Sequence, residues 1–197
     1  PDPSDGVIRR ATTAGAGPTD LVAAAISSHI AVDTAGGKIY WVDRGAGTNP
    51  RIRRSNLDGS NPQEVVTVSG FGTLNASDAT GLALDLTNGK LYWSRAGFGE
   101  INRCNLDGTN AERVFQDYPP TDAVFPPSPS LPVGNFSPAS LAVDPAGGRV
   151  YWHNTFLDRI ERLNLNGTGR TNLNVGAGAR SIALDLANGR IYWTNTA

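Results

Sequence analysis

The chain has 197 residues, a length that fits one domain or two small ones. Seventeen Lys and Arg against eighteen Asp and Glu give a formal net charge of −1, which argues against a nucleic-acid phosphate backbone as the partner. No apolar run is long enough to cross a membrane, and one cysteine with two histidines excludes an internal disulfide and a metal site made only of His and Cys.

Internal repetition organises the chain. A first phrase consists of a short apolar strand, an Asp, a tight turn containing Gly and a strand that ends in Tyr-Trp. It recurs at 30–43, 82–95, 141–154 and 182–195. A second phrase, built around Asp-Gly or Asn-Gly, recurs at 52–66, 101–115 and 160–174. Because Gly and Asn accept the positive φ of a tight turn, each phrase predicts a hairpin, and two successive hairpins predict one four-stranded antiparallel sheet.

Each end of the chain carries half of this pattern. Residues 7–22 align with 51–66 and form a second phrase without a first, whereas 182–195 is a first phrase without a second. The shortest repeat spacing is close to that of a propeller blade. We therefore predict an all-β fold, a β-propeller of four-stranded antiparallel blades with four repeats per chain. Three blades are whole and one is closed from the N-terminal and C-terminal halves, which would remove exposed sheet edges.

The prediction treats 1–197 as a single propeller domain. In chain order its parts are a half-blade at 7–26, blades at 29–68, 81–116 and 140–175, a half-blade at 181–197, and inserted loops at 45–50, 69–80 and 117–138. In such a blade, the turn between the second and third strands lies on the same face as the crossover to the next blade. All three insertions therefore fall on one face, called the loop face below, and insertions in repeat proteins often carry the binding site.

Together the phrases resemble the YWTD repeats of low-density-lipoprotein-receptor class B propellers. The likeness rests on copies such as IAVDTAGGKIYWVD followed by IRRSNLDG, and it covers nearly the whole chain outside the insertions. Only Asp43 keeps the family's final Asp. The resemblance implies a noncatalytic module that binds a protein partner and is secreted or on the cell surface. Since family propellers have six blades, the chain closes as a small ring, pairs with a second copy into a larger ring, or belongs to a longer protein.

Three recurring sets of residues allow both a chemical and a packing interpretation. The Asp that ends each first strand is interpreted as a turn cap, because Asp accepts backbone N–H groups there. The Tyr-Trp pairs are interpreted as packing groups rather than a stacking platform. For the recurring arginines, a repeated salt bridge or a stack on an aromatic ring is favoured over an anion site. The polar sets are Asp33, Asp85, Asp144, Asp185, Arg10, Arg54, Arg103 and Arg162.

Candidate ligand-binding residues are the aromatic, Arg, His and Asn side chains that the topology places on the loop face. Several belong to a Pro-rich insertion, where proline lowers the entropy lost on ordering. The predicted set is Arg44, Arg95, Phe98, Tyr118, Phe125, Phe136, His153, Asn154, Phe156, Arg180 and Asn195. This mixture suits a protein, peptide or glycan ligand. The same loop could instead cover an apolar patch or plug the channel.

The predicted function is therefore noncatalytic binding, with no catalytic and no metal-ligating residues assigned. One alternative is a metal-dependent lactonase or lyase, since some propeller hydrolases hold a divalent ion through Glu, Asn and Asp. Another is an architectural repeat segment of a larger surface protein. A structural calcium ion is the one cofactor left open. The predicted partners exclude nucleic acid, and the chain is either a monomer or a ring-forming dimer.

Overall fold

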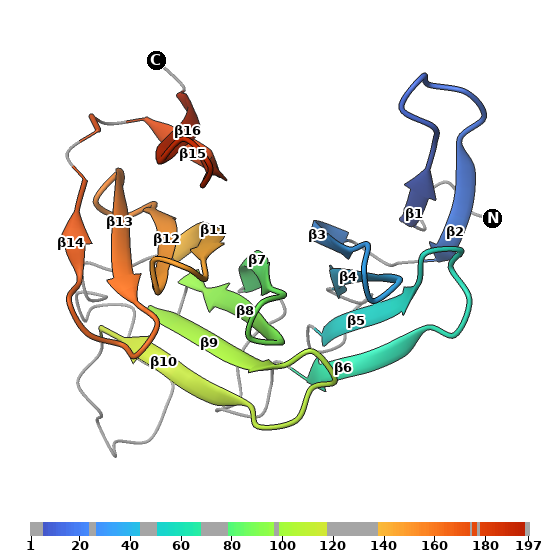
Figure 1. Cartoon of the computed structure of the whole chain (residues 1–197), viewed down its shortest axis with the longest axis horizontal. Helices are drawn as coiled ribbons and strands as arrows, with labels where there is room; N and C mark the ends of the chain where they lie inside the picture. The colour runs from blue at the N-terminus through green and yellow to red at the C-terminus, as the bar shows by residue number, and fades with distance from the viewer. Residues whose placement is uncertain are drawn as a thin grey trace, which may run out of the picture. The chain divides into compact units, whose positions relative to one another are not determined.

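The computed structural model describes residues 6–23, 27–43, 51–67, 79–96, 99–117, 138–173, 175–176 and 178–195. These residues form antiparallel strands joined by turns (Figure 1). Nowhere in these ranges is there a helix long and apolar enough to span a membrane. The chain divides into two compact units, Pro1–Ala79 with Leu106–Gly108, and Thr80–Asn105 with Thr109–Ala197.

The first unit holds a hairpin and one four-stranded sheet. The hairpin consists of β1 (Val7–Arg10) and β2 (Thr19–Ala23). The sheet takes its strands in chain order: β3 (Ser27–Asp33), β4 (Lys38–Asp43), β5 (Arg51–Asn56) and β6 (Gln63–Thr67).

The second unit repeats this architecture. Its first sheet contains β7 (Ala79–Asp85), β8 (Lys90–Arg95), β9 (Glu100–Asn105) and β10 (Glu112–Gln116). Its second sheet contains β11 (Pro138–Asp144), β12 (Arg149–Asn154), β13 (Arg159–Asn164) and β14 (Thr171–Asn172). A final hairpin consists of β15 (Ala179–Asp185) and β16 (Arg190–Asn195). The three complete sheets confirm the prediction of four-stranded antiparallel blades.

In each repeat, the hairpin of the first two strands turns at an Asp whose carboxylate caps the turn. In all four repeats, the Asp Oδ1 accepts the backbone N–H three residues on, at 2.7–3.1 Å. A glycine with φ of 62–65° completes the turn, a conformation that side chains disfavour. The residues are Asp33, Asp85, Asp144, Asp185, Gly37, Gly89, Gly148 and Gly189. The interpretation of these Asp as turn caps is confirmed.

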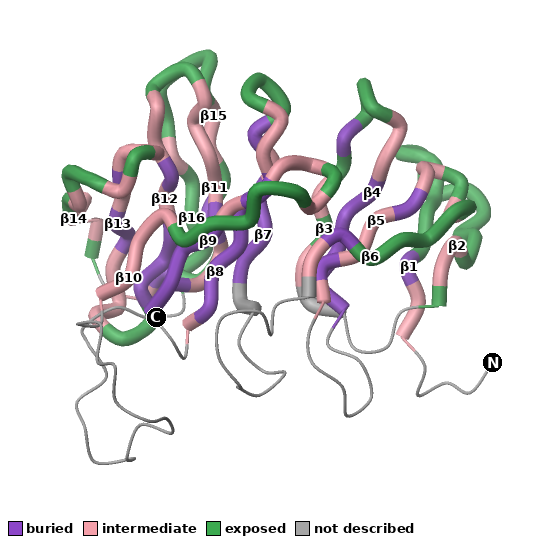
Figure 2. Tube along the Cα trace, turned by 90° about the horizontal axis from the view of Figure 1, so that it is seen from below, coloured by how far each residue is buried: buried purple, intermediate pink, exposed green. Residues whose placement is uncertain are grey.

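The Tyr-Trp pairs supply much of the core. Trp41, Trp93 and Trp152 are 0–1% exposed, and Figure 2 shows burial concentrated on the strands that carry them. Trp152 and Tyr92 belong to one apolar cluster that joins the β7–β10 and β11–β14 sheets. The packing interpretation therefore holds for the tryptophans of the complete sheets. In the last hairpin, Trp193 remains 38% exposed.

The strand boundaries correct the predicted ones. First strands begin at 27, 79, 138 and 179, two residues before the boundaries expected from the repeats. Ala79–Thr80 and Pro138 thus belong to strands rather than to insertions. The reason is a register shift, seen between Ala139 and Leu141, that lets pairing continue beyond the apolar triplet.

The two half-blades stay distinct in the described strand pairing. β1–β2 and β15–β16 are separate two-stranded sheets. Closure of one blade from both halves remains a prediction.

Candidate functional site

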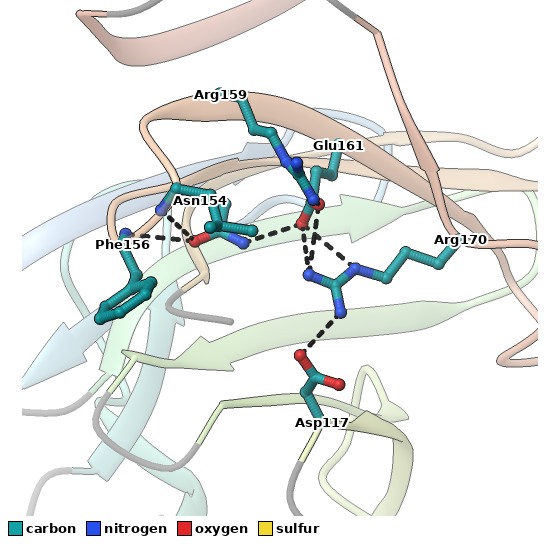
Figure 3. Close-up of polar contacts among 7 residues, drawn as sticks. Asp117, Asn154, Phe156, Arg159, Glu161 and Arg170 are labelled. Atoms are coloured by element: carbon teal, nitrogen blue, oxygen red, sulfur yellow. Dashed lines mark hydrogen bonds and ion pairs between the residues drawn. The ribbon is translucent and has the colours of Figure 1, made fainter. Parts of the chain in front are cut away.

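The site lies in the second unit where second strands end and third strands begin, the end of the sheets at which the sequence predicts the loop face. Its centre is Glu161 on β13, which is 1% exposed. This carboxylate accepts hydrogen bonds from the Arg159 guanidinium (2.5 Å), the Arg170 guanidinium (2.9 Å) and the Asn154 side-chain amide (2.9 Å) (Figure 3). Two guanidinium groups and one amide offset the cost of burying the charge. Glu161 therefore acts as a structural hub.

Asn154 joins this hub to an exposed aromatic ring. Its Oδ1 accepts the backbone N–H of Phe156 (3.1 Å) and of Leu157 (3.2 Å), while its amide nitrogen donates to Glu161. Asn154 is fully buried, whereas Phe156 is 54% exposed. Both ends of the Asn154 amide are thus engaged, which holds the β12–β13 turn in one conformation (Figure 3).

Arg170 extends the network to the neighbouring sheet. Its Nη1 donates to the Asp117 carboxylate at 2.7 Å, and its guanidinium carbon lies 5.7 Å from the centre of the Phe115 ring. The Asp117 N–H in turn donates to the carbonyl of Gly99 at 3.2 Å. Arg170 therefore links Glu161 on β13 to Phe115 and Asp117 at the end of β10 through ion pairs and a cation–π contact.

Each of the other complete sheets also buries a carboxylate beside two arginines, near the end of its second strand or the start of its third. Glu100, 1% exposed, lies 3.1 Å from Arg95 and 3.0 Å from Arg113. Asp43, 2% exposed, lies 3.3 Å from Arg53 and 3.8 Å from Arg51. The carboxylate sits on the second strand in one sheet and on the third in the others. A buried carboxylate held by two arginines is thus a repeated device of this fold.

His153 forms a second polar contact beside the hub. Its Nε2 lies 3.3 Å from Asp158 Oδ1, and Asp158 Oδ2 accepts the Gly178 N–H at 2.7 Å. Burial lowers the pKa of His153, although the Asp158 carboxylate opposes this effect. The Gly178 N–H lowers the pKa of Asp158, helped by a smaller contribution from His153. Arg180 is close enough to lower both pKa values.

Stability should fall as the pH drops below the ordinary His pKa of 6.5 because of His153. Its lowered pKa means that the unfolded chain takes up the proton first, so acid favours unfolding between 6.5 and the folded-state value. The variant His153→Ser, which copies Ser94 in the preceding sheet, should flatten this dependence. The measurement is urea unfolding at several values between about pH 7.5 and 5. An unchanged slope in the variant would contradict the assignment.

The structure divides the predicted ligand residues into three groups. Arg44, Phe98, Tyr118, Phe125 and Phe136 lie outside the described residues. Arg95, His153 and Asn154 were expected on an accessible face but are at most 2% exposed. Their side chains contact Glu100, Asp158 and Glu161, which lie on third strands or in the turn that precedes one. Phe156, Arg180 and Asn195 are exposed. Ligand contact by any of them stays a prediction.

Sequence reasoning missed the residues that hold this region together. These are Asp117, Asp158, Arg159, Glu161 and Arg170. Their signal was present as opposite charges on paired strands, since each complete sheet has a carboxylate near two arginines. The signal was hard to recognise because the charges exchange strands from one repeat to the next.

The donor set here fits a cation poorly. Among the described residues, no three His, Cys, Asp or Glu side chains gather as a metal site would require. The buried carboxylates Asp43, Glu100 and Glu161 already contact arginines, which repel a second cation. A structural calcium ion stays a prediction of the sequence.

Parts of this sequence are similar to known proteins. No family model matches it. It is 40% identical over 81 residues to low-density lipoprotein receptor-related protein 5-like protein from Homo sapiens, a match covering 41% of this chain and 29% of that protein. It is 26% identical over 143 residues to low-density lipoprotein receptor-related protein 1 from Pyricularia oryzae, covering 67% and 40%. The chain therefore spans less than half of these curated relatives.

Solved structures share the fold at low sequence identity. A nidogen–laminin complex matches with a TM-score of 0.68 and 21% identity over 93% of this chain and 62% of that chain. A gluconolactonase from Xanthomonas campestris matches with a TM-score of 0.67 and 19% identity over 96% and 62%. The repeated hairpins, the four-stranded sheets and these solved structures show a β-propeller fold, and the receptor-related relatives show that its repeats are similar to the YWTD-type repeats of low-density-lipoprotein-receptor class B propellers.

Proposed function

We propose that the chain is a noncatalytic binding module that engages a protein or peptide through the loop face of its propeller. The observation that carries this proposal is Phe156, a large aromatic side chain that is 54% exposed on a turn pinned by Asn154. A rigid exposed aromatic loses little entropy on binding and is a frequent energetic centre of protein interfaces. The receptor-related relatives support binding as the general role.

Charge near this turn favours a ligand with an acidic group. Arg180 is exposed and lies close enough to Asp158 and His153 to shift their pKa values. The Asp158 end of the turn therefore combines an apolar anchor with a guanidinium, and Arg is enriched with aromatics at interface cores. We propose a peptide segment carrying an apolar side chain and a carboxylate. A secreted or cell-surface setting agrees with the receptor-related relatives.

Hydrolase chemistry receives less support from the same residues. The resemblance to a gluconolactonase at 19% identity concerns the fold. The buried carboxylates Glu100 and Glu161 form ion pairs with arginines, so they are poor general bases and poor metal ligands. We therefore propose binding rather than catalysis for this face.

The variant Phe156→Ser tests the proposal. Peptides from a phage-displayed random library, selected on the intact chain, should bind this variant at least about tenfold more weakly, because the hydrophobic anchor is lost. Titration calorimetry or surface plasmon resonance would measure the affinities. A glycan array probed with the same protein tests the glycan alternative.

The matched control is Leu186→Ser. Leu186 is 50% exposed, comparable with Phe156, but lies in the β15–β16 turn at the opposite end of the strands. The control should bind selected peptides within about twofold of the original chain. Equal losses in both variants, or binding unaffected by Phe156→Ser, would contradict the proposed face. Glycan binding without peptide binding would transfer the role to a sugar ligand.

A further inference from the structure

Three of the four recurring arginines have partners within the protein. Arg10, Arg54 and Arg103 each donate from Nη1 to a leucine carbonyl in a turn between third and fourth strands, at 2.9–3.1 Å. Arg103 also lies 2.7 Å from the Glu112 carboxylate and 3.4 Å from the Tyr92 hydroxyl. The salt-bridge interpretation of the recurring arginines is therefore confirmed at Arg103, and at Arg10 and Arg54 a backbone carbonyl accepts instead.

The fourth of these arginines, Arg162 on β13, differs from the others. It makes no hydrogen bond or ion pair in the part of the chain that the structure describes. On β10, Glu112 stands opposite Arg103, whereas the residue opposite Arg162 on β14 is Thr171. The predicted salt bridge is absent here because the fourth strand has no acidic side chain at that position.

Two further arginines beside Arg162 also keep their donors available. In the β7–β10 sheet, the first residue of the second strand is Lys90, which donates to the Asn105 side chain at 2.6 Å. Arg149 takes the same place on β12, opposite Asn164, but makes no such bond among the described residues. Arg190, the first residue of β16, likewise has no hydrogen-bond or ion-pair partner there.

These three arginines line one cavity of about 360 Å³ between the β11–β14 sheet and the β15–β16 hairpin. Two carboxylates also line it, but each is hydrogen-bonded within its own hairpin turn: Asp144 accepts the Gly147 N–H, and Asp185 accepts from the Asn188 N–H and side chain. The lining therefore has three cationic groups against two anionic ones. The rest of the wall is largely apolar and includes Tyr151, Leu173, Leu184, Leu186 and Ile191.

The preceding sheet contains the equivalent cavity, of about 330 Å³, and its cations are already bound. Lys90 and Arg103 line that cavity, with Asn105 and Glu112 as their respective partners. The two cavities are thus similar in volume and position within the repeat. The cavity at Arg149 is distinguished by guanidinium groups whose N–H donors have no protein acceptor in the described ranges.

We propose that this cavity binds the anionic group of a phosphate or sulfate ester whose organic part is apolar. Such a group presents three free oxygens, and guanidinium groups from β12, β13 and β16 supply charged donors to all of them. A carboxylate has only two oxygens and matches three arginines less well. Leu173, Ile191 and the Tyr151 ring cover the organic part. The cavity lies at the opposite end of β12 from the Phe156 turn, so it does not depend on the proposed peptide surface.

Titration calorimetry of the whole chain with phenyl phosphate and phenyl sulfate, at constant ionic strength, tests the site. One ester per chain should bind with a Kd of about 1 mM or tighter, and phenol should not bind measurably. Arg149→Gln and Arg162→Gln should each weaken binding at least about tenfold, because a charged hydrogen bond is lost. Since neither arginine has a protein partner among the described residues, the midpoint of urea unfolding should stay unchanged in both variants.

The matched control is Lys90→Gln, which removes one positive charge at the position equivalent to Arg149 in the preceding sheet. This variant should bind phenyl phosphate within about twofold of the original chain. An equal loss in the control would overturn the proposal, since general charge attraction or the other cavity would then be responsible. Phenol binding as tightly as the esters, or no ester binding up to about 10 mM, would also overturn it.

Discussion

Replacing Gly108 with alanine should lower the free energy of unfolding by about 3 kcal/mol or more. Gly108 has a φ of 92°, and an added Cβ would overlap the Val65 carbonyl oxygen. That oxygen belongs to the backbone of β6, so no side-chain rotation relieves the overlap and the strand itself must shift. Urea unfolding of the whole chain, followed by tryptophan fluorescence, measures the loss.

Gly89→Ala separates crowding from backbone strain. Gly89 has a φ of 62°, but no atom lies within 4 Å of an added Cβ. Only the cost of positive φ applies there, about 1 kcal/mol. If both variants lost the same stability, the close approach of Gly108 to the Val65 carbonyl would contribute nothing to stability.

Replacing Glu100 with alanine should cost about 3–5 kcal/mol, because removing one partner of a buried ion pair leaves the other charge desolvated. Glu100 and Arg95 are both about 2% exposed at the side chain and lie 3.1 Å apart. Arg113 would lose the same carboxylate, at 3.0 Å. Thermal and urea unfolding at neutral pH would measure the change.

Glu112→Ala is the matched control on the same sheet. Glu112 also pairs with an arginine, Arg103, at 2.7 Å, but its side chain is 53% exposed. Exposed pairs of this kind contribute at most about 1 kcal/mol. The double variant Arg95→Leu with Glu100→Leu should recover part of the stability, since both charges leave together. A Glu100→Ala chain as stable as the Glu112→Ala chain would show that the buried charge is unimportant.

The buried ion networks bear on function through rigidity. In the second unit, Glu161 fixes Asn154, and Asn154 fixes the β12–β13 turn that exposes Phe156. A binding group supported in this way retains its orientation before the ligand arrives. Changes at Glu161 should therefore affect ligand binding and stability together, whereas changes at Phe156 should affect binding alone.

The fold was predictable because its signals are local. An Asp, a Gly at positive φ and a following Tyr-Trp strand specify each hairpin within a few residues, and every described copy adopts that hairpin. The boundaries were less predictable. The register shift near Ser140 extends β11, and nothing in the apolar pattern announces it.

The repeats predicted the strand positions of several candidate residues but not whether their side chains are buried. Strand order placed Arg95, His153, Asn154 and Phe156 at or just after the ends of second strands. The sequence alone did not distinguish the buried side chains among them from the exposed ones. Burial depended on Glu100, Asp158 and Glu161, whose charges meet these residues through strand pairing and turns. Such contacts join positions whose charges do not repeat in a fixed order.

The sequence by itself determined the repeated hairpins, their Asp caps and the turns that require glycine, because each depends on the conformation of a few adjacent residues. Tertiary structure alone decided which charges are buried and why Phe156 remains exposed on a turn held by Asn154. Those outcomes depend on which neighbouring strand is present beside each side chain, and burial is a property of that neighbour as much as of the residue.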